Sequence, residues 1–330
     1  MIGKRIRGRL ANALDRRFAD LASRVDALQV SIDRQNEQSE QRAHAEAVMQ
    51  ASLAGLEQTV NGELSGMIRA IATEEAPNRR ALFELRERPD YQRAFSEAKP
   101  LVSICIPTCI GRTELLIERA LPSALAQTYE NIEVVVVGDA VGDDAAAAIQ
   151  SVRDERVKFV NLTNRVAHPD AHGQWLNAAV MPRNEAHRQA RGLWVTDLDD
   201  DDALRPDAIE VLLNMAQSRN LEVAYGVLER CDTNGDRTTI GAFPPMPLEP
   251  NWREKGMQWQ PWQGMASTGA LFHGGLRFFM REHVAAVLGM PGDFYRLERM
   301  VRAGVRFGMV EQIVYDYFPS KLWEAPASGP

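Results

Sequence analysis

The stretch Leu193–Pro206, LWVTDLDDDDALRP, decides the fold of the chain around it. Apolar residues alternate through Leu198, as in a short strand, and four carboxylates, Asp199–Asp202, follow at once. Two carboxylates about 4 Å apart repel by roughly 4 kcal/mol near a protein surface. A divalent cation compensates for this, because Mg²⁺ and Mn²⁺ prefer oxygen ligands and keep positions open for phosphates. The stretch therefore indicates a site for a metal and a phosphate.

The acidic run also allows two other interpretations. A solvated acidic loop is the ordinary explanation of a charge run. A calcium loop needs glycine at its sixth position and glutamate at its twelfth, but here Asp202 and Ala208 stand there, although Asp197, Asp199 and Asp201 fit the first three ligand positions. The calcium loop is excluded, and the choice between loop and metal site depends on the rest of the chain.

The composition of the chain excludes several classes of protein. The 330 residues carry a formal net charge of -7, which argues against nucleic acid as the main partner. No run of 18 apolar residues is present, so no segment is expected to span a membrane. The three cysteines have neither disulfide-framework nor metal-site spacing, which suits a reducing compartment. We expect a cytoplasmic protein.

Residues 1–75 form a separate N-terminal region. Alternate steps of three and four residues from Ala11 to Ala70 meet mostly apolar side chains, with four polar steps between Gln35 and Glu46. This is the seam of a coiled coil and predicts a homo-oligomer through residues 11–70, of open strand number. One or two amphipathic helices packed on the following domain remain the alternative. The basic first ten residues allow at most peripheral contact with the inner face of a membrane.

The remaining chain divides into a linker with a short helix at 76–100, a large domain at 101–320 and a disordered tail at 321–330. From residue 101, strands and helices alternate, which predicts an α/β domain with a mostly parallel sheet flanked by helices. The expected strands are 101–107, 132–137 and 157–162, and the expected helices are 114–126, distorted at Pro122, and 145–152.

Polar or small residues follow three of the expected strands. They are Pro107-Thr108, Gly138-Asp139 and the run that starts at Asp199. Since ligands of such sheets bind beyond the carboxyl ends of the strands, these positions are expected to share one site.

These residues occur in a familiar order. Val102–Thr108 is an opening strand that ends in Pro-Thr, Leu125–Val137 reads LAQTYENIEVVVV, and Arg183-Asn184 precedes Arg191-Gly192 and the acidic run. Over about residues 101–318 the chain is similar to the large family of inverting, GT-A-fold glycosyltransferases that use nucleotide-sugar donors. The resemblance implies a GT-A domain with a nucleotide-sugar half at 101–206 and an acceptor half at 207–320.

For the donor base, the resemblance implies that Asp139 accepts a hydrogen bond from the imide N–H of uracil or a similar base. Pro107, Thr108 and Cys109 would line the base pocket. The family usually has an acidic pair followed by Gly-Ser where this chain has Gly138–Val141, and an aromatic residue in place of Cys109. Cys109 is interpreted as a small wall residue, and the identity of the base stays open.

For the diphosphate, the resemblance implies that Arg183 faces the nucleotide, where a guanidinium pairs well with phosphate oxygens. Asp199 and Asp200 would contact the nucleotide sugar, with Asp199 and Asp201 as ligands of Mn²⁺ or Mg²⁺. The ion would neutralise the departing diphosphate.

In the acceptor half, Gly292–Gly304 resembles the family's acidic segment at the start of a helix that ends in Ala-Gly. The resemblance implies that Asp293 is the general base that takes the proton of the acceptor hydroxyl. The alternative is a helix N-cap, for which Asp is a favoured residue.

The sequence therefore predicts a metal-dependent inverting glycosyltransferase of glycan or polysaccharide biosynthesis, with a UDP-sugar as the expected donor and a glycan, lipid-linked or protein acceptor. The first alternative is a catalytically weak nucleotide-sugar-binding scaffold that acts through its coiled coil. A nucleotidyltransferase would need a glycine-rich basic loop after the first strand, and Pro107–Arg112 supplies too little glycine.

Overall fold

The computed structural model describes residues 76–165, 176–240, 268–281 and 291–319, with residues 17, 19–26, 49, 50, 52, 53, 55, 173, 283 and 285. The chain divides into two compact units, Met1–Glu75 and Ala76–Pro330. The predicted tail at 321–330 and most of the predicted coiled coil at 11–70 lie outside the described residues. Residues 19–26 are helical, and among them only Leu21 and Val25, two positions of the predicted seam, are partly buried. The oligomer stays a prediction.

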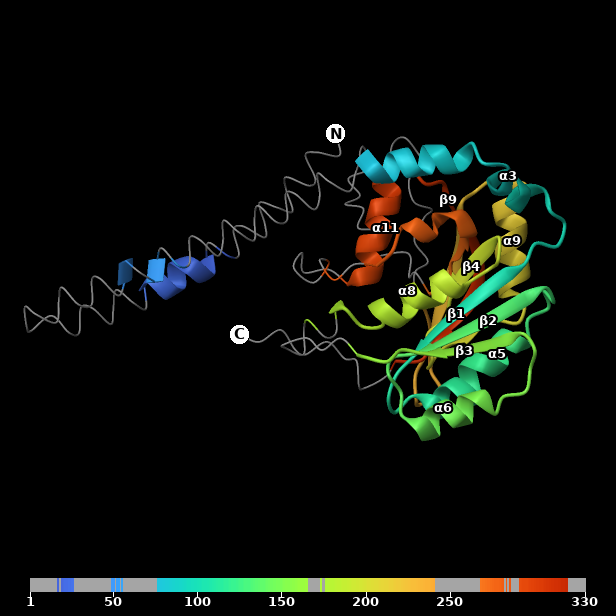
Figure 1. Cartoon of the computed structure of the whole chain (residues 1–330), viewed down its shortest axis with the longest axis horizontal. Helices are drawn as coiled ribbons and strands as arrows, with labels where there is room; N and C mark the ends of the chain where they lie inside the picture. The colour runs from blue at the N-terminus through green and yellow to red at the C-terminus, as the bar shows by residue number, and fades with distance from the viewer. Residues whose placement is uncertain are drawn as a thin grey trace, which may run out of the picture. The chain divides into compact units, whose positions relative to one another are not determined.

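One mixed sheet organises the second unit (Figure 1). Its first half is parallel and has the order β3-β2-β1-β4, with bounds β1 Val102–Thr108, β2 Ile132–Gly138, β3 Val157–Asn161 and β4 Trp194–Asp197. The register pairs Thr108 with Gly138 and Cys105 with Asp197. Because these strands are parallel, their carboxyl ends meet at one edge of the sheet.

The second half of the sheet continues β4 with the order β8-β6-β9-β5, and β7 pairs with β6. The bounds are β5 Ala203–Leu204, β6 Val223–Cys231, β7 Arg237–Ile240, β8 Leu271–His273 and β9 Phe307–Tyr317. The α/β fold class is confirmed, but the prediction of a mostly parallel sheet holds only for the first half. The chain returns here through short connections, such as the Asn234-Gly235 turn between β6 and β7, which join antiparallel strands.

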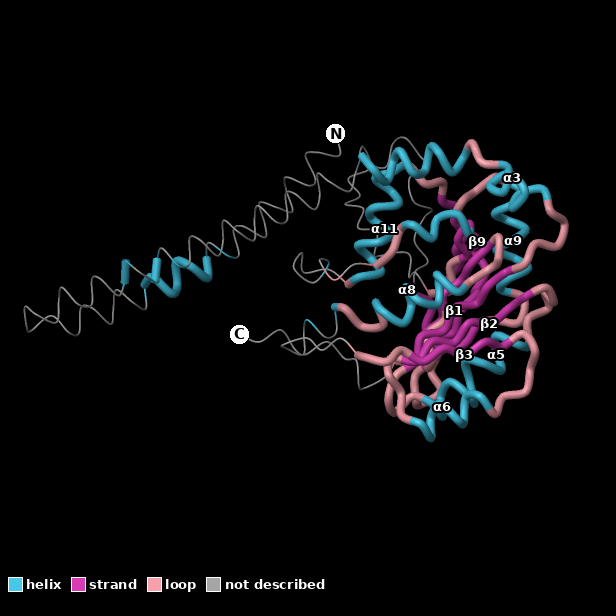
Figure 2. Tube along the Cα trace, in the orientation of Figure 1, coloured by secondary structure: helices cyan, strands magenta, loops and turns pink. Residues whose placement is uncertain are grey.

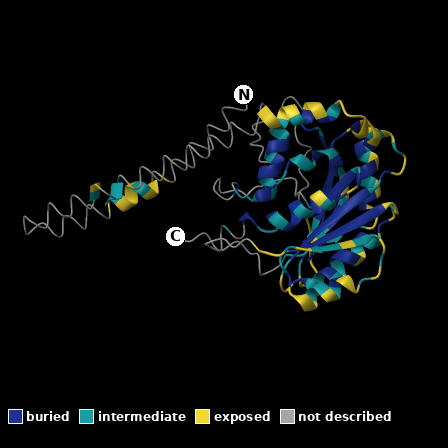
Figure 3. Ribbon diagram, in the orientation of Figure 1, coloured by how far each residue is buried: buried dark blue, intermediate teal, exposed yellow. Residues whose placement is uncertain are grey.

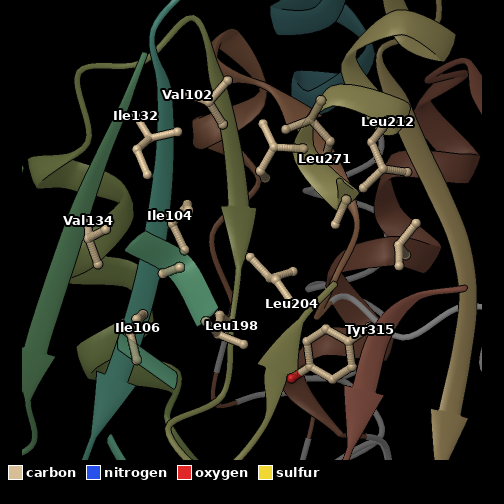
Figure 4. Close-up of a cluster of buried hydrophobic side chains, with 14 of the residues drawn as sticks. Val102, Ile104, Ile106, Ile132, Val134, Leu198, Leu204, Leu212, Leu271 and Tyr315 are labelled. Atoms are coloured by element: carbon tan, nitrogen blue, oxygen red, sulfur yellow. The ribbon is translucent and has the colours of Figure 1, made fainter. Parts of the chain in front are cut away.

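Helices cover both faces of the parallel half (Figure 2). Alternate residues such as Cys105 and Val135 pack against Ala186 of α8, Val180–Gln189. Their neighbours Ile104 and Val134 belong to the main core on the other face, shown in part in Figure 4. The helical segments η1 Leu116–Ala120, α5 Leu121–Leu125 and α6 Asp143–Gln150 contribute to this core, and α9 Ala208–Ser218 extends it under the second half of the sheet. Burial on both faces explains why these strands are almost entirely apolar.

The distortion predicted at Pro122 takes the form of a π-helical turn. The η1 segment has π geometry and ends at Ala120, two residues before the proline in α5. Proline has no N–H to donate and its ring crowds the preceding turn, and a widened turn relieves both problems. The helix continues through the proline instead of ending there.

The segment predicted as a linker is part of the folded domain. Residues 76–86 are helical, and α3, Pro89–Ser96, follows. Their side chains Leu82, Leu85 and Tyr91 are buried in a second core with residues of β8, of η3 Gly274–Phe278 and of α11 Gly292–Ala303. Figure 3 shows these helices with one buried and one exposed side. None of the described helices is both long and apolar enough to cross a membrane.

A buried carboxylate fastens this segment to the sheet. Glu222, just before β6, is fully buried and accepts hydrogen bonds from Arg86 Nε at 2.7 Å and Nη2 at 2.8 Å. The hydroxyl of Tyr91 and the N–H of Arg306 each donate to it at 2.8 Å. Burial works to raise the pKa of Glu222, but these donors hold it below its ordinary value.

The Glu222→Gln variant is expected to lower the free energy of unfolding by about 2–3 kcal/mol, because it leaves Arg86 and Tyr91 without a buried carboxylate. Urea denaturation at pH 7 measures it. Since the pKa of Glu222 is lowered on folding, its charge stabilises the fold above the ordinary value of 4.5 and less as the pH falls below it. The difference between the proteins should therefore shrink in acid.

Glu84→Gln, which removes an exposed pair with Arg80, is the control and should change stability by less than about 0.5 kcal/mol. Equal losses in both variants would contradict this role of Glu222.

The turn after β2 has a strained residue. Ala140 has a φ of 54°, in the left-handed region where an L-residue is disfavoured by about 1–2 kcal/mol. Asn161 holds the turn, because its side chain accepts from Val141 N at 3.0 Å and donates to Val141 O at 2.9 Å.

Ala140→Gly is expected to raise the free energy of unfolding by about 0.5–1 kcal/mol, since glycine adopts this φ without strain and loses part of the gain to chain entropy. Ala146→Gly, in α6, should instead destabilise by about 1 kcal/mol. Thermal and urea unfolding of both variants test the pair. A loss of stability in Ala140→Gly would show that the turn carries no strain.

Candidate functional site

A cavity of about 400 Å³ lies at the carboxyl ends of β1, β2 and β4. All nine residues proposed from the sequence line it, from five separate segments: Pro107, Thr108, Cys109, Asp139, Arg183, Asp199, Asp200, Asp201 and Asp293. The structure thus brings the predicted residues together, as the parallel register requires. Their roles in binding and catalysis stay predictions.

The first wall of the cavity is built by the ends of β1 and β2. The N–H of Asp139 donates to Thr108 O at 2.7 Å, which joins the two strand ends. Burial raises the pKa of Asp139, and Arg165, whose Nε is 3.2 Å from Asp139 Oδ2, opposes this shift. Burial also raises the pKa of Cys109 to about 11. A thiol with such a pKa is protonated at neutral pH, which agrees with its interpretation as a wall residue.

The acidic run forms the floor of the cavity, and its carboxylates have different surroundings. Asp200 is buried, which raises its pKa to about 7. Asp202 is buried too and accepts from Tyr315 Oη and from Phe318 N, each at 2.7 Å. Both oxygens of Asp202 are therefore engaged by the end of β9, and this carboxylate fixes the loop.

Two arginines neutralise the two predicted metal ligands. Arg183 Nη2 bonds Asp199 Oδ1, and Arg112 Nη1 bonds Asp201 Oδ2. Both arginine side chains are almost fully buried, at 5% and 2% exposed. Burial works to lower the pKa of Arg183, but Asp199 and Asp197 hold it above its ordinary value. Two carboxylates of the acidic run are thus paired with buried cations, of which Arg183 also lines the cavity.

The donor set fits a divalent cation that also binds phosphates. Among the residues that the structure describes, only Glu229, Cys231 and Asp316 bring three candidate ligand atoms within 4.8 Å of one another, and none of them lines the cavity. Arginines already pair with that group. The cavity therefore offers at most a pair of carboxylates, such as Asp199 and Asp201. This suits Mg²⁺ or Mn²⁺, which commonly take one or two carboxylates and complete their shell with water and phosphate.

Asp293 reaches the cavity from the start of α11. The N-cap of this helix is Pro291, so the alternative interpretation of Asp293 as an N-cap is wrong. Asp293 lies in the first turn, where a carboxylate is stabilised by the positive end of the helix. Its Oδ1 accepts from Phe294 N at 2.9 Å. Gly292 and Phe294 line the cavity beside it.

Several residues of the site were missed in the sequence. Arg112, Arg165 and Arg281 all contribute to the cavity or to its acidic floor. Arg112 was detectable as a basic residue just after the first strand. Asp197 was the clearest missed signal, because a charged residue in a strand expected to be buried needs partners.

Comparison with known proteins agrees with this architecture. The chain matches glycosyl transferase family 2 over residues 103–284, more than half of its length. It is 29% identical over 144 residues to an uncharacterized glycosyltransferase of Haemophilus influenzae, a segment that covers 43% of this chain and 52% of that protein. It is 31% identical over 143 residues, 43% of this chain, to the Escherichia coli UDP-Glc:alpha-D-GlcNAc-diphosphoundecaprenol beta-1,3-glucosyltransferase WfgD, of which that segment covers 50%.

Among solved structures, S. aureus TarS 1–349 in complex with UDP superposes with a TM-score of 0.49 at 18% identity. That superposition covers 66% of this chain and 60% of the TarS chain. The matches with curated relatives span about half of their length. The family match over residues 103–284 includes β1, β2, the acidic run and Arg281. This chain belongs to glycosyl transferase family 2.

Proposed function

We propose that the chain transfers a sugar from a UDP-sugar to an acceptor hydroxyl with inversion at the anomeric carbon. The observation that carries the proposal is the convergence of a nucleotide wall, a carboxylate pair and Asp293 on one cavity. A single displacement needs the donor on one side of the anomeric carbon and a base on the other. The contribution of separate segments, the acidic run after β4 and the start of α11, to one cavity supports this arrangement.

On the donor side, Asp139 accepts the imide N–H of the base, and Thr108 and Cys109 border the ring. Arg165 is the resting partner of Asp139 and moves to the ligand when the base takes its place. Arg183 donates to the diphosphate from its buried position beside Asp199. When bound by Asp199 and Asp201, Mn²⁺ or Mg²⁺ supplies neutralisation of the leaving diphosphate.

On the acceptor side, Asp293 takes the proton of the acceptor hydroxyl as that oxygen attacks the anomeric carbon. Its place in the first turn of α11 and the hydrogen bond from Phe294 N fix the direction of the carboxylate. The name of the WfgD relative states a lipid diphosphate acceptor for that protein. We extend this to a lipid-linked acceptor here, reached by a cytoplasmic protein at the inner face of a membrane, with residues 11–70 as the oligomerisation segment.

The Asp293→Asn variant is expected to lower kcat by about 10²–10⁴-fold while the KM for the donor stays nearly constant, because only proton removal is lost. Initial rates of UDP-sugar turnover with Mn²⁺ measure both constants. Asp143→Asn, in the first turn of α6 and outside the cavity, is the matched control and should behave like wild type. Equal rates in all three proteins would exclude Asp293 as the base, whereas negligible turnover in all three would favour the scaffold alternative.

Ligand binding should raise the apparent melting temperature in the presence of Mn²⁺. UDP at a hundred times its Kd should stabilise the fold by about 2.7 kcal/mol. A thermal-shift series with UDP, GDP, CDP and dTDP identifies the base, and UDP is expected to give the largest shift. EDTA or Asp201→Asn should reduce the shift. The absence of a shift with all four nucleotides would contradict a nucleotide-sugar donor.

A further inference from the structure

A buried charged cluster lies behind the cavity, around a carboxylate that the proposed function does not use. Asp197, the last residue of β4, is fully buried. Its Oδ1 is 2.7 Å from His187 Nε2, and its Oδ2 is 3.2 Å from both Arg281 Nη2 and Arg296 Nη1. Arg183 Nη1 lies 3.8 Å from Oδ1. One carboxylate therefore contacts three guanidinium groups and an imidazole.

These partners come from both halves of the domain. His187 and Arg183 belong to α8, Arg281 follows η3, and Arg296 belongs to α11. Arg183 and Arg281 line the cavity, whereas the other partners do not. Asp197 thus lies behind the two buried arginines that face the ligand space and contacts both.

Carboxylates match the guanidinium groups of the cluster in number. Burial lowers the pKa of His187 to about 4, so its imidazole is neutral at pH 7. Three guanidinium groups then face the carboxylates of Asp197 and Asp199, and Asp293 acts on Arg281 from the cavity side. Charge balance in this buried region therefore depends on Asp197, because its loss leaves the arginines short of one carboxylate.

The contacts also restrict how the arginines can move. The side chain of Asn184 donates to Arg281 O at 2.8 Å and accepts from Arg281 N at 2.9 Å, which fixes the backbone of Arg281. Asp197 fixes its guanidinium group. Arg296 donates through Nε to Phe279 O at 2.8 Å, and its guanidinium lies 4.5 Å from the centre of the Phe272 ring.

The same carboxylate reaches the helix of the proposed base. Arg296 lies three residues after Asp293 on α11, one turn along the same helix. The contact of Arg296 with Asp197 therefore fixes the turn of α11 that carries Asp293 relative to β4.

We propose that Asp197 is a positioning residue that holds Arg183 and Arg281 for the donor diphosphate and, through Arg296, sets the place of Asp293. It touches neither donor nor acceptor. The inference rests on the proposed function, because it takes the ligand of the two arginines to be a nucleoside diphosphate. It adds that donor affinity depends on a carboxylate behind the wall of the cavity.

A double-mutant cycle on UDP affinity tests the proposal. Asp197→Asn, Arg183→Gln and the double variant are compared with wild type by isothermal titration of UDP in Mn²⁺ buffer. Each single variant is expected to raise the Kd by about tenfold or more. The double variant should lose clearly less affinity than the sum of the two single losses, because Asp197 acts in part through Arg183 and in part through Arg281. Additive losses would overturn the positioning role.

Two further variants separate positioning from folding. Glu222→Gln removes another buried carboxylate with an arginine partner and should leave the Kd for UDP unchanged. Asp197→Asn combined with Arg296→Met removes one charge of each sign and should recover the thermal stability lost in Asp197→Asn, while the Kd stays raised. Recovery of wild-type affinity in this combination would reduce Asp197 to a structural role and overturn the proposal.

The proposed function and this inference fail in different ways. Wild-type protein that does not bind UDP would overturn the assigned donor and the positioning role with it. Tight binding by wild type, with an additive cycle or with wild-type affinity in the charge-balanced combination, would overturn only the role of Asp197.

Discussion

Parallel pairing of β1 with both β2 and β4 is the constraint on which the rest of the domain depends. It sets Thr108 beside Gly138 and Cys105 beside Asp197, so that three strands end at one edge. The loops that follow these strands therefore lie close together. The hydrogen bond from Asp139 N to Thr108 O joins the loops after β1 and β2.

Crowded carboxylates at that edge are tolerated because three of the four have a defined partner. Asp199 pairs with Arg183, Asp201 with Arg112, and Asp202 with the hydroxyl of Tyr315. These contacts hold the acidic loop in one geometry before any ligand arrives. Of the two arginines, Arg183 lines the cavity, where its guanidinium group suits a phosphate as well as the carboxylate of Asp199.

Local sequence patterns predicted much of this architecture. The apolar runs around Ile104 and Val134 predicted buried strands, and the polar residues after them predicted the edge that holds the site. The mixed half of the sheet was harder to predict from the sequence. The strands β8 and β9 are short or irregular in pattern, and they pair with strands far apart in the chain. The linker interpretation of 76–100 overlooked that Leu82, Leu85 and Tyr91 needed a surface to cover.

The charged contacts of Asp197 could not be predicted from the sequence for a related reason. Arg281 and Arg296 lie 84 and 99 residues from Asp197 along the chain, and nothing local marks them as its partners. The N-cap interpretation of Asp293 failed because the helix begins at Gly292, with Pro291 as its N-cap. Composition does not determine a helix boundary to within a residue or two.

The contacts of Asp197 mean that the parts of the domain before and after Pro206 are not interchangeable modules. A chimera of two relatives joined near Pro206 would inherit Asp197 from one parent and residues 281 and 296 from the other. Unless both parents carry the same set, such a chimera buries a carboxylate without two of its arginine partners. Recombination in this lineage is therefore expected to preserve or exchange these three positions together.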